Sequence, residues 1–238
     1  MPKDSVGLIY DTTSSSWSVL FKKDTDTGVY VDYFKHFITS NSDEIITSQV
    51  SGAGAANNPT TDTTYLSRID STTGTTTTGR AAIQGANTMV RLTSTERWFN
   101  ERIIRTGASA FDGTEQGTVR VGFIDSATGE STEAAMFRYG GTSNGNFIAV
   151  TRSANVETGT ATDTGVAVAT GTYYRLSVYW DGTSVRYYID DVLVATHTTN
   201  IWSTAPSGVG CMILKSAGTN ARVVGSIYNT IKHQFINA

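Results

Sequence analysis

The segment from Tyr173 to His197, YYRLSVYWDGTSVRYYIDDVLVATH, constrains the fold of this chain more than any other. Apolar and polar residues alternate along three short runs in it, which is typical of β-strands with one buried face. The pairs Asp181-Gly182 and Asp190-Asp191 separate the runs, and such pairs favour tight turns between antiparallel strands. The segment therefore predicts a three-stranded β-meander.

The alternation also predicts two different faces for the meander. The expected inward residues are Tyr174, Leu176, Val178, Trp180, Val185, Tyr187 and Ile189. The expected outward residues are Arg175, Ser177, Tyr179, Arg186 and Tyr188. Arginine and tyrosine are enriched where proteins meet, and aromatic rings also stack on sugars, so this outward patch is a candidate subunit interface or glycan site. Ordinary cross-strand pairing is the alternative interpretation. Outside the meander, Trp202 is a further candidate, as an exposed aromatic residue.

Short strand-like segments recur along the rest of the chain. They are Trp17–Phe21, Val29–Ile38, Thr88–Leu92, Trp98–Arg105, Val119–Ile124, Ala135–Tyr139, Phe147–Arg152, Val166–Ala169, Val209–Leu214 and Arg222–Phe235, the last with a break. No segment has the apolar stripe and caps of an amphipathic helix. The pattern predicts an all-β fold, an antiparallel β-sandwich or jelly roll, with residues 1–238 as a single domain.

The segment from Ser51 to Gly85 interrupts this pattern. It is dominated by Gly, Ala, Asn and Thr, as in GAGAANNPTTDTT, and has few large apolar residues. We expect a long irregular loop or extended arm here. A structureless segment of this length is uncommon unless it is functional, disordered or held by a partner.

Composition excludes several classes of protein. Charged residues make up 16% of the chain and the formal net charge is −3, which provides no basic surface for nucleic acid. There is no apolar run long enough for a transmembrane helix, and MPKDSVGLIYD lacks the apolar core of a signal peptide. We therefore expect a chain made in the cytoplasm that contacts neither nucleic acid nor membrane. Its single cysteine, Cys211, lies in an apolar run and is expected to be a buried core residue.

The strand sequences VRVGFID, AMFRYGG and NFIAVTR, followed by the meander, resemble the concanavalin A-like lectin/glucanase superfamily, especially its laminin-G-like members. The resemblance extends from about Thr88 to Phe235. One departure is Asp191, where that family usually has glycine, but aspartate tolerates the left-handed conformation that the turn requires. The resemblance implies two stacked antiparallel sheets, with ligands on the concave face or at the loop tips.

Catalytic motifs are weak in this sequence. Glucanases of the superfamily carry three acidic residues at i, i+2 and i+4 on one strand; here the only i, i+2 pair, Asp24 and Asp26, lies in the turn-rich KKDTDTG. A G-x-S-x-G match at 141–145 lies between two expected strands, so a hairpin loop is the better interpretation. The histidines, His36, His197 and His233, show no metal-ligand spacing. We expect no catalytic residue, no metal, no cofactor and no enzymatic activity.

Three functional classes remain. A jelly roll of this composition is similar to head-decoration and fibre proteins of tailed phages, so we expect a structural virion protein, located in the virion. It would assemble as a homo-oligomer, such as a trimer, and with other virion proteins, using the Ser51–Gly85 arm as a strap. A carbohydrate-binding module or lectin that binds glycans is the alternative. A glycoside hydrolase or lyase ranks third, because the acidic triplet is missing.

Overall fold

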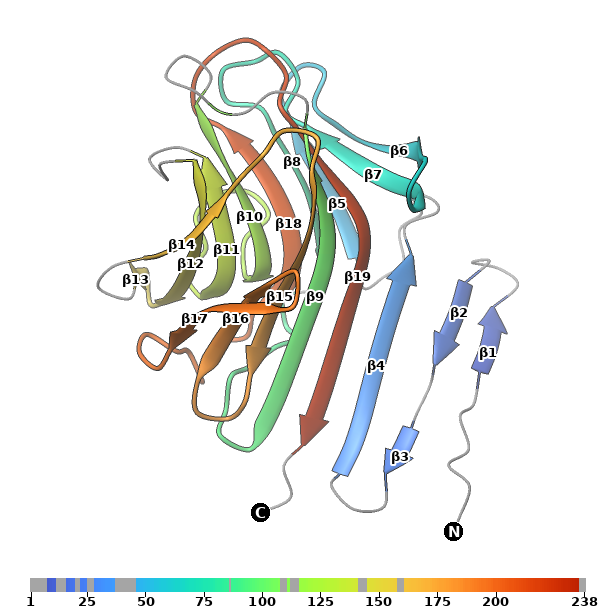
Figure 1. Cartoon of the computed structure of the whole chain (residues 1–238), viewed down its shortest axis with the longest axis vertical. Coiled ribbons are helices and arrows are strands. Elements are labelled where there is room, and N and C mark those ends of the chain that lie inside the picture. The colour runs from blue at the N-terminus through green and yellow to red at the C-terminus, as the bar shows by residue number, and fades with distance from the viewer. Residues whose placement is uncertain are drawn as a thin grey trace.

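The computed structural model describes residues 8–11, 16–19, 22–24, 28–36, 46–85, 87–107, 111, 116–140, 145–157 and 161–235. Its regular elements over these residues are β-strands (Figure 1). They are β1 Leu8–Asp11, β2 Ser16–Val19, β3 Lys22–Asp24, β4 Gly28–His36, β5 Ile46–Ser51, β6 Ala56–Asp62, β7 Leu66–Thr72, β8 Arg80–Gly85, β9 Glu96–Thr106, β10 Gly117–Ile124, β11 Ala134–Gly140, β12 Asn146–Ser153, β13 Val156–Glu157, β14 Thr162–Ala167, β15 Tyr173–Trp180, β16 Val185–Ile189, β17 Val192–His197, β18 Gly208–Lys215 and β19 Val223–Phe235. The all-β prediction is confirmed.

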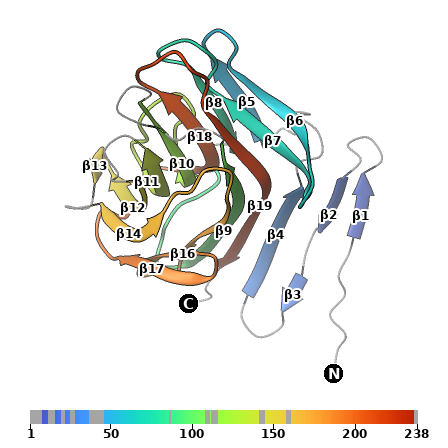
Figure 2. The same cartoon turned by 45° about the horizontal axis from the view of Figure 1, so that its top comes forward.

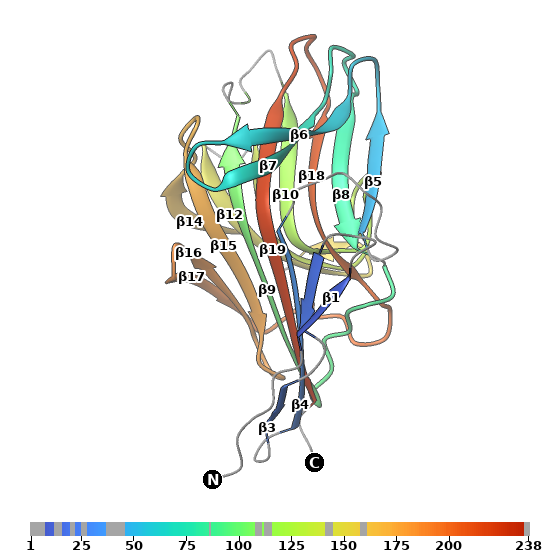
Figure 3. The same ribbon diagram turned by 90° about the vertical axis from the view of Figure 1, so that its right-hand side faces the viewer.

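Two antiparallel sheets face each other (Figures 1 and 3). Sheet I has nine strands in the order β17-β16-β15-β9-β19-β4-β3, and β7 pairs with β19 while β6 pairs with β7. Sheet II has eight strands in the order β13-β12-β11-β10-β18-β8-β5, with β14 paired to β12. A further pair, β1 and β2, is separate. The predicted antiparallel sandwich is thus correct.

The meander is confirmed as β15, β16 and β17 at one edge of sheet I. Asp190 and Asp191 have φ angles of 48° and 67°, so both residues of the second turn are left-handed, as a two-residue hairpin requires. At the first turn, Oδ1 of Asp181 accepts hydrogen bonds from the backbone N–H groups of Thr183 and Ser184. The local turn chemistry therefore fixes both reversals.

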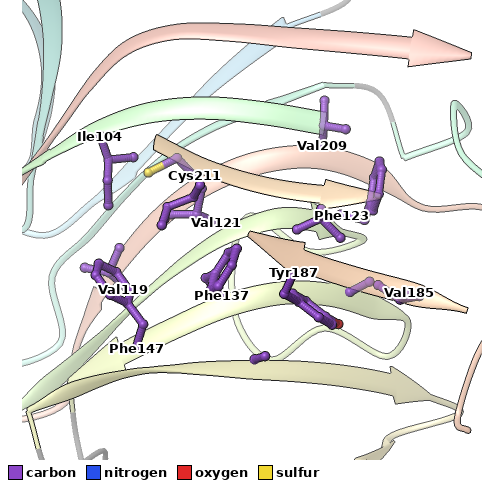
Figure 4. Close-up of a cluster of buried hydrophobic side chains, with 14 of the residues drawn as sticks. Ile104, Val119, Val121, Phe123, Phe137, Phe147, Val185, Tyr187, Val209 and Cys211 are labelled. Carbon is purple, nitrogen blue, oxygen red and sulfur yellow. The ribbon is translucent and has the colours of Figure 1, made fainter. Parts of the chain in front are cut away.

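The core lies between the sheets, where the inward side chains of both interlock (Figure 4). The Phe137 ring meets Tyr187 edge-on at 5.4 Å between ring centroids, and Phe147 meets Tyr174 in the same way at 4.9 Å. The Tyr187 hydroxyl donates to the backbone carbonyl of Val150 at 2.7 Å, so its polar end is satisfied inside the core. Burying each large apolar side chain contributes about 1.5–3 kcal/mol. Cys211 is buried here, as expected.

The expected arm at Ser51–Gly85 is wrong. Instead, β5 and β8 extend sheet II, and β6 and β7 form a hairpin beside β19 (Figure 2). Polar side chains hold this hairpin to sheet II, since the Asn57 amide donates to the carbonyl of Ala82 at 3.0 Å and to the hydroxyl of Ser48 at 2.8 Å. Small residues occupy the buried positions of β8, where the neighbours Ala81 and Ala82 are both fully buried. Strands built from such small and polar residues give little hydrophobic signal.

Two further expectations differ from the structure. Thr88–Leu92 is not a strand; it contributes a single bridge between Val90 and Ser207. Trp202 is not exposed, because only 2% of its surface is accessible and it packs in the core between the sheets. The chain around Trp202 turns inward, and Ser207 then pairs with Val90 by backbone hydrogen bonds. An isolated tryptophan in a loop carries no periodicity that would have shown its direction.

Candidate functional site

The outward side of sheet I forms a continuous surface that we call outer face I. Because strand residues alternate between faces and the register aligns β16, β15, β9 and β19, these side chains point the same way. Its main polar and aromatic members are Arg97, Phe99, Glu101 and Arg105 of β9, Tyr173, Arg175, Ser177 and Tyr179 of β15, Arg186 and Tyr188 of β16, and Tyr228, Lys232 and Gln234 of β19. Cations and aromatic rings therefore share one sheet surface.

Four of the five residues selected from sequence come together on this face. Arg175 and Tyr179 lie on β15, with Arg186 and Tyr188 beside them on β16. The side chains of Arg175 and Arg186 are each 43% exposed. Their role in binding stays a prediction. The fifth, Trp202, is excluded by its burial.

A pocket of about 160 Å³ opens at one end of outer face I, next to the β16–β17 turn. Its lining is Tyr65, Ile103, Tyr173, Tyr174, Arg175, Asp190 and Asp191. We call it the Asp191 pocket. The Arg175 guanidinium contacts the Asp191 carboxylate at 2.8 Å. Because Asp191 is 71% exposed, this ion pair is worth little and an incoming anion can replace it.

Tyr173 is rigidly held at the edge of the Asp191 pocket. Its hydroxyl donates to Oδ2 of Asp62 on the β6–β7 hairpin at 2.8 Å, and its ring lies 5.3 Å from that of Tyr65. On β9, the Arg105 guanidinium lies 5.8 Å from the Tyr173 ring centre. Burial acts to raise the pKa of Asp62, but hydrogen bonds from Arg68, Tyr173 and backbone N–H groups outweigh it and hold the pKa well below its usual range. The unexpected hairpin thus builds one wall of the pocket.

A larger pocket of about 320 Å³ opens at the other end of the face. Its lining is Arg97, Trp98, Phe99, Tyr179, Lys232, His233 and Gln234. We call it the Tyr179 pocket. The rings of Trp98 and His233 stack at 3.8 Å with 6° between their planes, and the Trp98 indole donates to Oε2 of Glu96 at 2.9 Å. Burial lowers the pKa of His233, although the nearby Glu96 carboxylate partly opposes this. Aromatic walls with cations at the rim suit a sugar that carries negative charge.

Glu101 lies between the two pockets and binds two hydroxyl groups. Directly opposite it on β15, the Ser177 hydroxyl donates to Oε2 at 3.0 Å. From β19 on its other side, the Tyr228 hydroxyl donates to Oε1. Tyr228 faces outward next to a β-bulge between Ser226 and Tyr228, where the pairing with β9 shifts by one residue. Bulges often occur beside active sites, where they redirect a side chain.

Sequence analysis missed Glu101 and Tyr228. Arg222–Phe235 was expected to contain a break, and the structure has a continuous strand whose irregularity is this bulge. The two residues are 127 positions apart, so their contact depends on strand pairing that no local pattern shows. The one sequence signal for Glu101 was its position as the single carboxylate in the segment ERIIR, whose other residues are apolar or cationic.

The expected absence of a metal was based on histidine spacing. Over the described residues, no three His, Cys, Asp or Glu side chains gather where they could hold a metal ion. His197 is buried between the hydroxyls of Thr151 and Thr162, at 3.0 and 2.9 Å from its ring nitrogens, and burial lowers its pKa. The side chain of His36 and residues 141–144 of the G-x-S-x-G match lie outside the described residues. The described part of the chain also contains no helix with the length and hydrophobicity that crossing a bilayer requires.

The stacked antiparallel sheets form the kind of β-sandwich that the sequence resemblance implied, and solved carbohydrate-recognition and lyase domains share this fold. More narrowly, a family model described as "SO2946-like, C-terminal domain" matches residues 65–225, so the chain belongs to this family. Comparison with curated proteins gave no match.

Three solved structures illustrate the range of proteins with this fold. The protein of unknown function SO2946 from Shewanella oneidensis MR-1 is similar with a TM-score of 0.63, at 13% identity over 90% of both chains. The endo-β-1,4-glucuronan lyase of the fungus Trichoderma reesei has a TM-score of 0.54, at 11% identity over 84% of this chain and 94% of its own. The carbohydrate recognition domain of Emp46p has a TM-score of 0.52, at 9% identity over 82% and 93%. At these identities the likeness shows the fold alone.

These neighbours correct one expectation and leave another without support. The expectation that the chain is not an enzyme, which was based on weak catalytic motifs, is wrong, because a glucuronan lyase shares this fold. None of the three is described as a virion protein, so the phage context gains no support from them. The homo-oligomer and the virion location stay predictions.

Proposed function

We propose that this protein binds an acidic polysaccharide along outer face I. One observation carries the proposal: Arg175, Ser177 and Tyr179 form an outward row on β15 that joins the Asp191 pocket to the Tyr179 pocket. The four residue steps from Arg175 to Tyr179 span about 13 Å at ~3.3 Å per step, a length that fits a short run of sugar rings. The row thus suits a linear polymer better than a single small ligand.

The charges on the face favour a ligand with carboxylates. Arg97, Arg105 and Lys232 accompany the two arginines of the meander, and Lys232 is exposed. A guanidinium binds a carboxylate through two parallel hydrogen bonds, which is stronger and more specific than a neutral contact. Tyr179 and Phe99 add aromatic surface in the Tyr179 pocket. The fold is shared with a glucuronan lyase and a carbohydrate recognition domain, which is consistent with this proposal.

Titration calorimetry with a panel of polysaccharides tests the proposal. We expect polyglucuronate or polymannuronate to bind at least about tenfold more tightly than an uncharged β-glucan of equal length, which corresponds to ~1.4 kcal/mol. Binding should weaken as salt rises from about 0.01 to 1 M, because the Debye length falls from ~30 to ~3 Å. Equal affinity for charged and uncharged polymers would show that the cations of outer face I do not select the ligand.

A further inference from the structure

We propose that Glu101 and Tyr228 form a proton-transfer pair that cleaves uronate-containing polysaccharides by β-elimination on outer face I. The inference rests on the proposed function, because it requires a polyuronate to lie across this face. It adds a reaction, a substrate stereochemistry and two catalytic residues to what binding alone implies. Each can be tested separately from binding.

The position of the pair suits proton transfer to a bound polymer. Glu101 and Tyr228 are both partly exposed, so a sugar lying between the two pockets can reach them. The Tyr228 hydroxyl donates directly to Glu101, which provides a path for a proton between the two side chains. Ser177 holds the other carboxylate oxygen at 3.0 Å and so fixes the orientation of Glu101.

The charge pattern favours elimination over hydrolysis. Glycoside hydrolysis usually needs two carboxylates about 5–10 Å apart across the glycosidic bond. Of the side chains that the structure describes between the two pockets, Glu101 is the one carboxylate. Elimination needs one base, one acid and a cation that binds the uronate carboxylate. Arg175 is diagonal to Glu101 across the β9–β15 pair, at about 7–8 Å for such neighbours.

The reaction balances with these groups alone. Arg175 binds the uronate carboxylate and stabilises the charge that develops on it. The Glu101 carboxylate takes the proton from C5, and the electron pair of the C5–H bond forms the C4=C5 double bond. The C4–O4 bond breaks, its electron pair goes to O4, and the Tyr228 hydroxyl gives O4 its proton. The protonated Glu101 then returns a proton to the Tyr228 phenolate along their hydrogen bond, which restores both groups.

The geometry also selects the sugar. Glu101 and Tyr228 lie side by side on one sheet surface, so they approach the polymer from the same side. The C5 hydrogen and O4 must then lie on one side of the sugar ring, which is a syn elimination. D-Glucuronate and D-mannuronate linked through O4 meet this condition, whereas L-guluronate does not. We therefore expect polyglucuronate or polymannuronate to be cleaved and polyguluronate to be bound without cleavage.

The experiment follows the absorbance of the unsaturated uronate product with each of the three polymers, using the full chain. We expect Tyr228→Phe and Glu101→Gln each to lower turnover by about 10²–10⁴-fold, the usual contribution of a general acid or base. Their affinity for the polymer should change by less than about threefold, because neither group is a principal charge contact. The matched control is Tyr139→Phe, which removes the same hydroxyl from a side chain buried in the core.

The outcomes separate this inference from the proposed function. If the wild-type chain binds the polymers but forms no unsaturated ends on either D-uronate polymer, the elimination is wrong and the binding proposal stands. Turnover that survives in folded Tyr228→Phe and Glu101→Gln variants would assign the chemistry to other residues. Cleavage of polyguluronate at an equal rate would rule out the one-sided geometry. A chain that binds none of the polymers overturns both proposals.

Discussion

The outward faces of the two sheets differ although both carry several arginines. On sheet II, outer face II contains Arg120, Arg138 and Arg152, and their guanidinium groups are paired with Glu130 and Glu157. On sheet I, Arg97 and Arg175 line the two pockets; the pair of Arg175 with Asp191 is open to solvent, and Arg186, which is 43% exposed, pairs with Asp181. Arginines of both faces are paired within the chain, but Arg175 and Arg186 are more exposed than the three arginines of outer face II.

Outer face II is closed because the segment 125–133 folds over it. Arg120 is only 2% exposed and donates to the backbone carbonyl of Gly129 at 2.6 Å, while Ala127 joins an apolar cluster on the same face. Burial lowers the pKa of Arg120 to about 10, and the neighbouring Arg138 and Arg152 contribute to this. Counting arginines on a surface therefore predicts little about binding. The exposed fraction of each arginine side chain is more informative.

For the comparison of the two outer faces, the largest expected effect is on ligand affinity. Arg175→Gln combined with Tyr179→Ala should weaken polyuronate binding about 100-fold, or ~2.7 kcal/mol, because a charged contact and an aromatic contact are both lost. The matched variant on outer face II, Arg138→Gln, should change affinity by less than about twofold. Both can be measured by titration calorimetry at one salt concentration. A larger loss from Arg138→Gln than from the double variant would reverse the comparison of the two faces.

The next effect is on the free energy of unfolding, and it should be larger for a variant on outer face II than for one on outer face I. Glu130→Gln should lower the free energy of unfolding by about 2 kcal/mol, because it leaves the buried Arg120 without its carboxylate. Asp191→Asn on outer face I should cost less than about 1 kcal/mol, since Asp191 and its partner Arg175 are both exposed. Urea unfolding of the two variants beside the wild type provides the measurement. Equal losses would mean that the Arg120–Glu130 pair contributes no more to the free energy of unfolding than a surface ion pair does.

The parts of this comparison that sequence could predict are those fixed by local patterns. Alternation and turn residues placed Arg175 and Tyr179 outward together, because both signals lie within one short segment. The Glu101–Tyr228 contact could not be found in this way, since it depends on a bulge and on the pairing of distant strands. The β6–β7 hairpin was missed because small polar side chains, such as Asn57, hold it instead of an apolar stripe. The candidate site therefore depends on the pairing of distant strands as well as on patterns within single segments.

The smallest expected effect concerns Asp181, which borders outer face I. It accepts hydrogen bonds within its own turn and also pairs with Arg186 at 2.7 Å. Burial acts to raise its pKa, but hydrogen bonds from Ser184 and Thr183 outweigh it and lower the pKa to about 2. A carboxyl whose pKa is depressed by folding stabilises the protein above its unfolded pKa, and this contribution is lost as pH falls toward the folded value.

Asp181→Asn removes this titration while keeping one acceptor oxygen. The wild type should therefore be more stable than the variant by about 1 kcal/mol at pH 7. The difference should shrink as pH falls from about 4 to about 2. Thermal unfolding of the wild type and Asp181→Asn across this pH range measures the difference. A difference that stays constant down to pH 2 would show that the stability of the turn does not depend on the charge of Asp181.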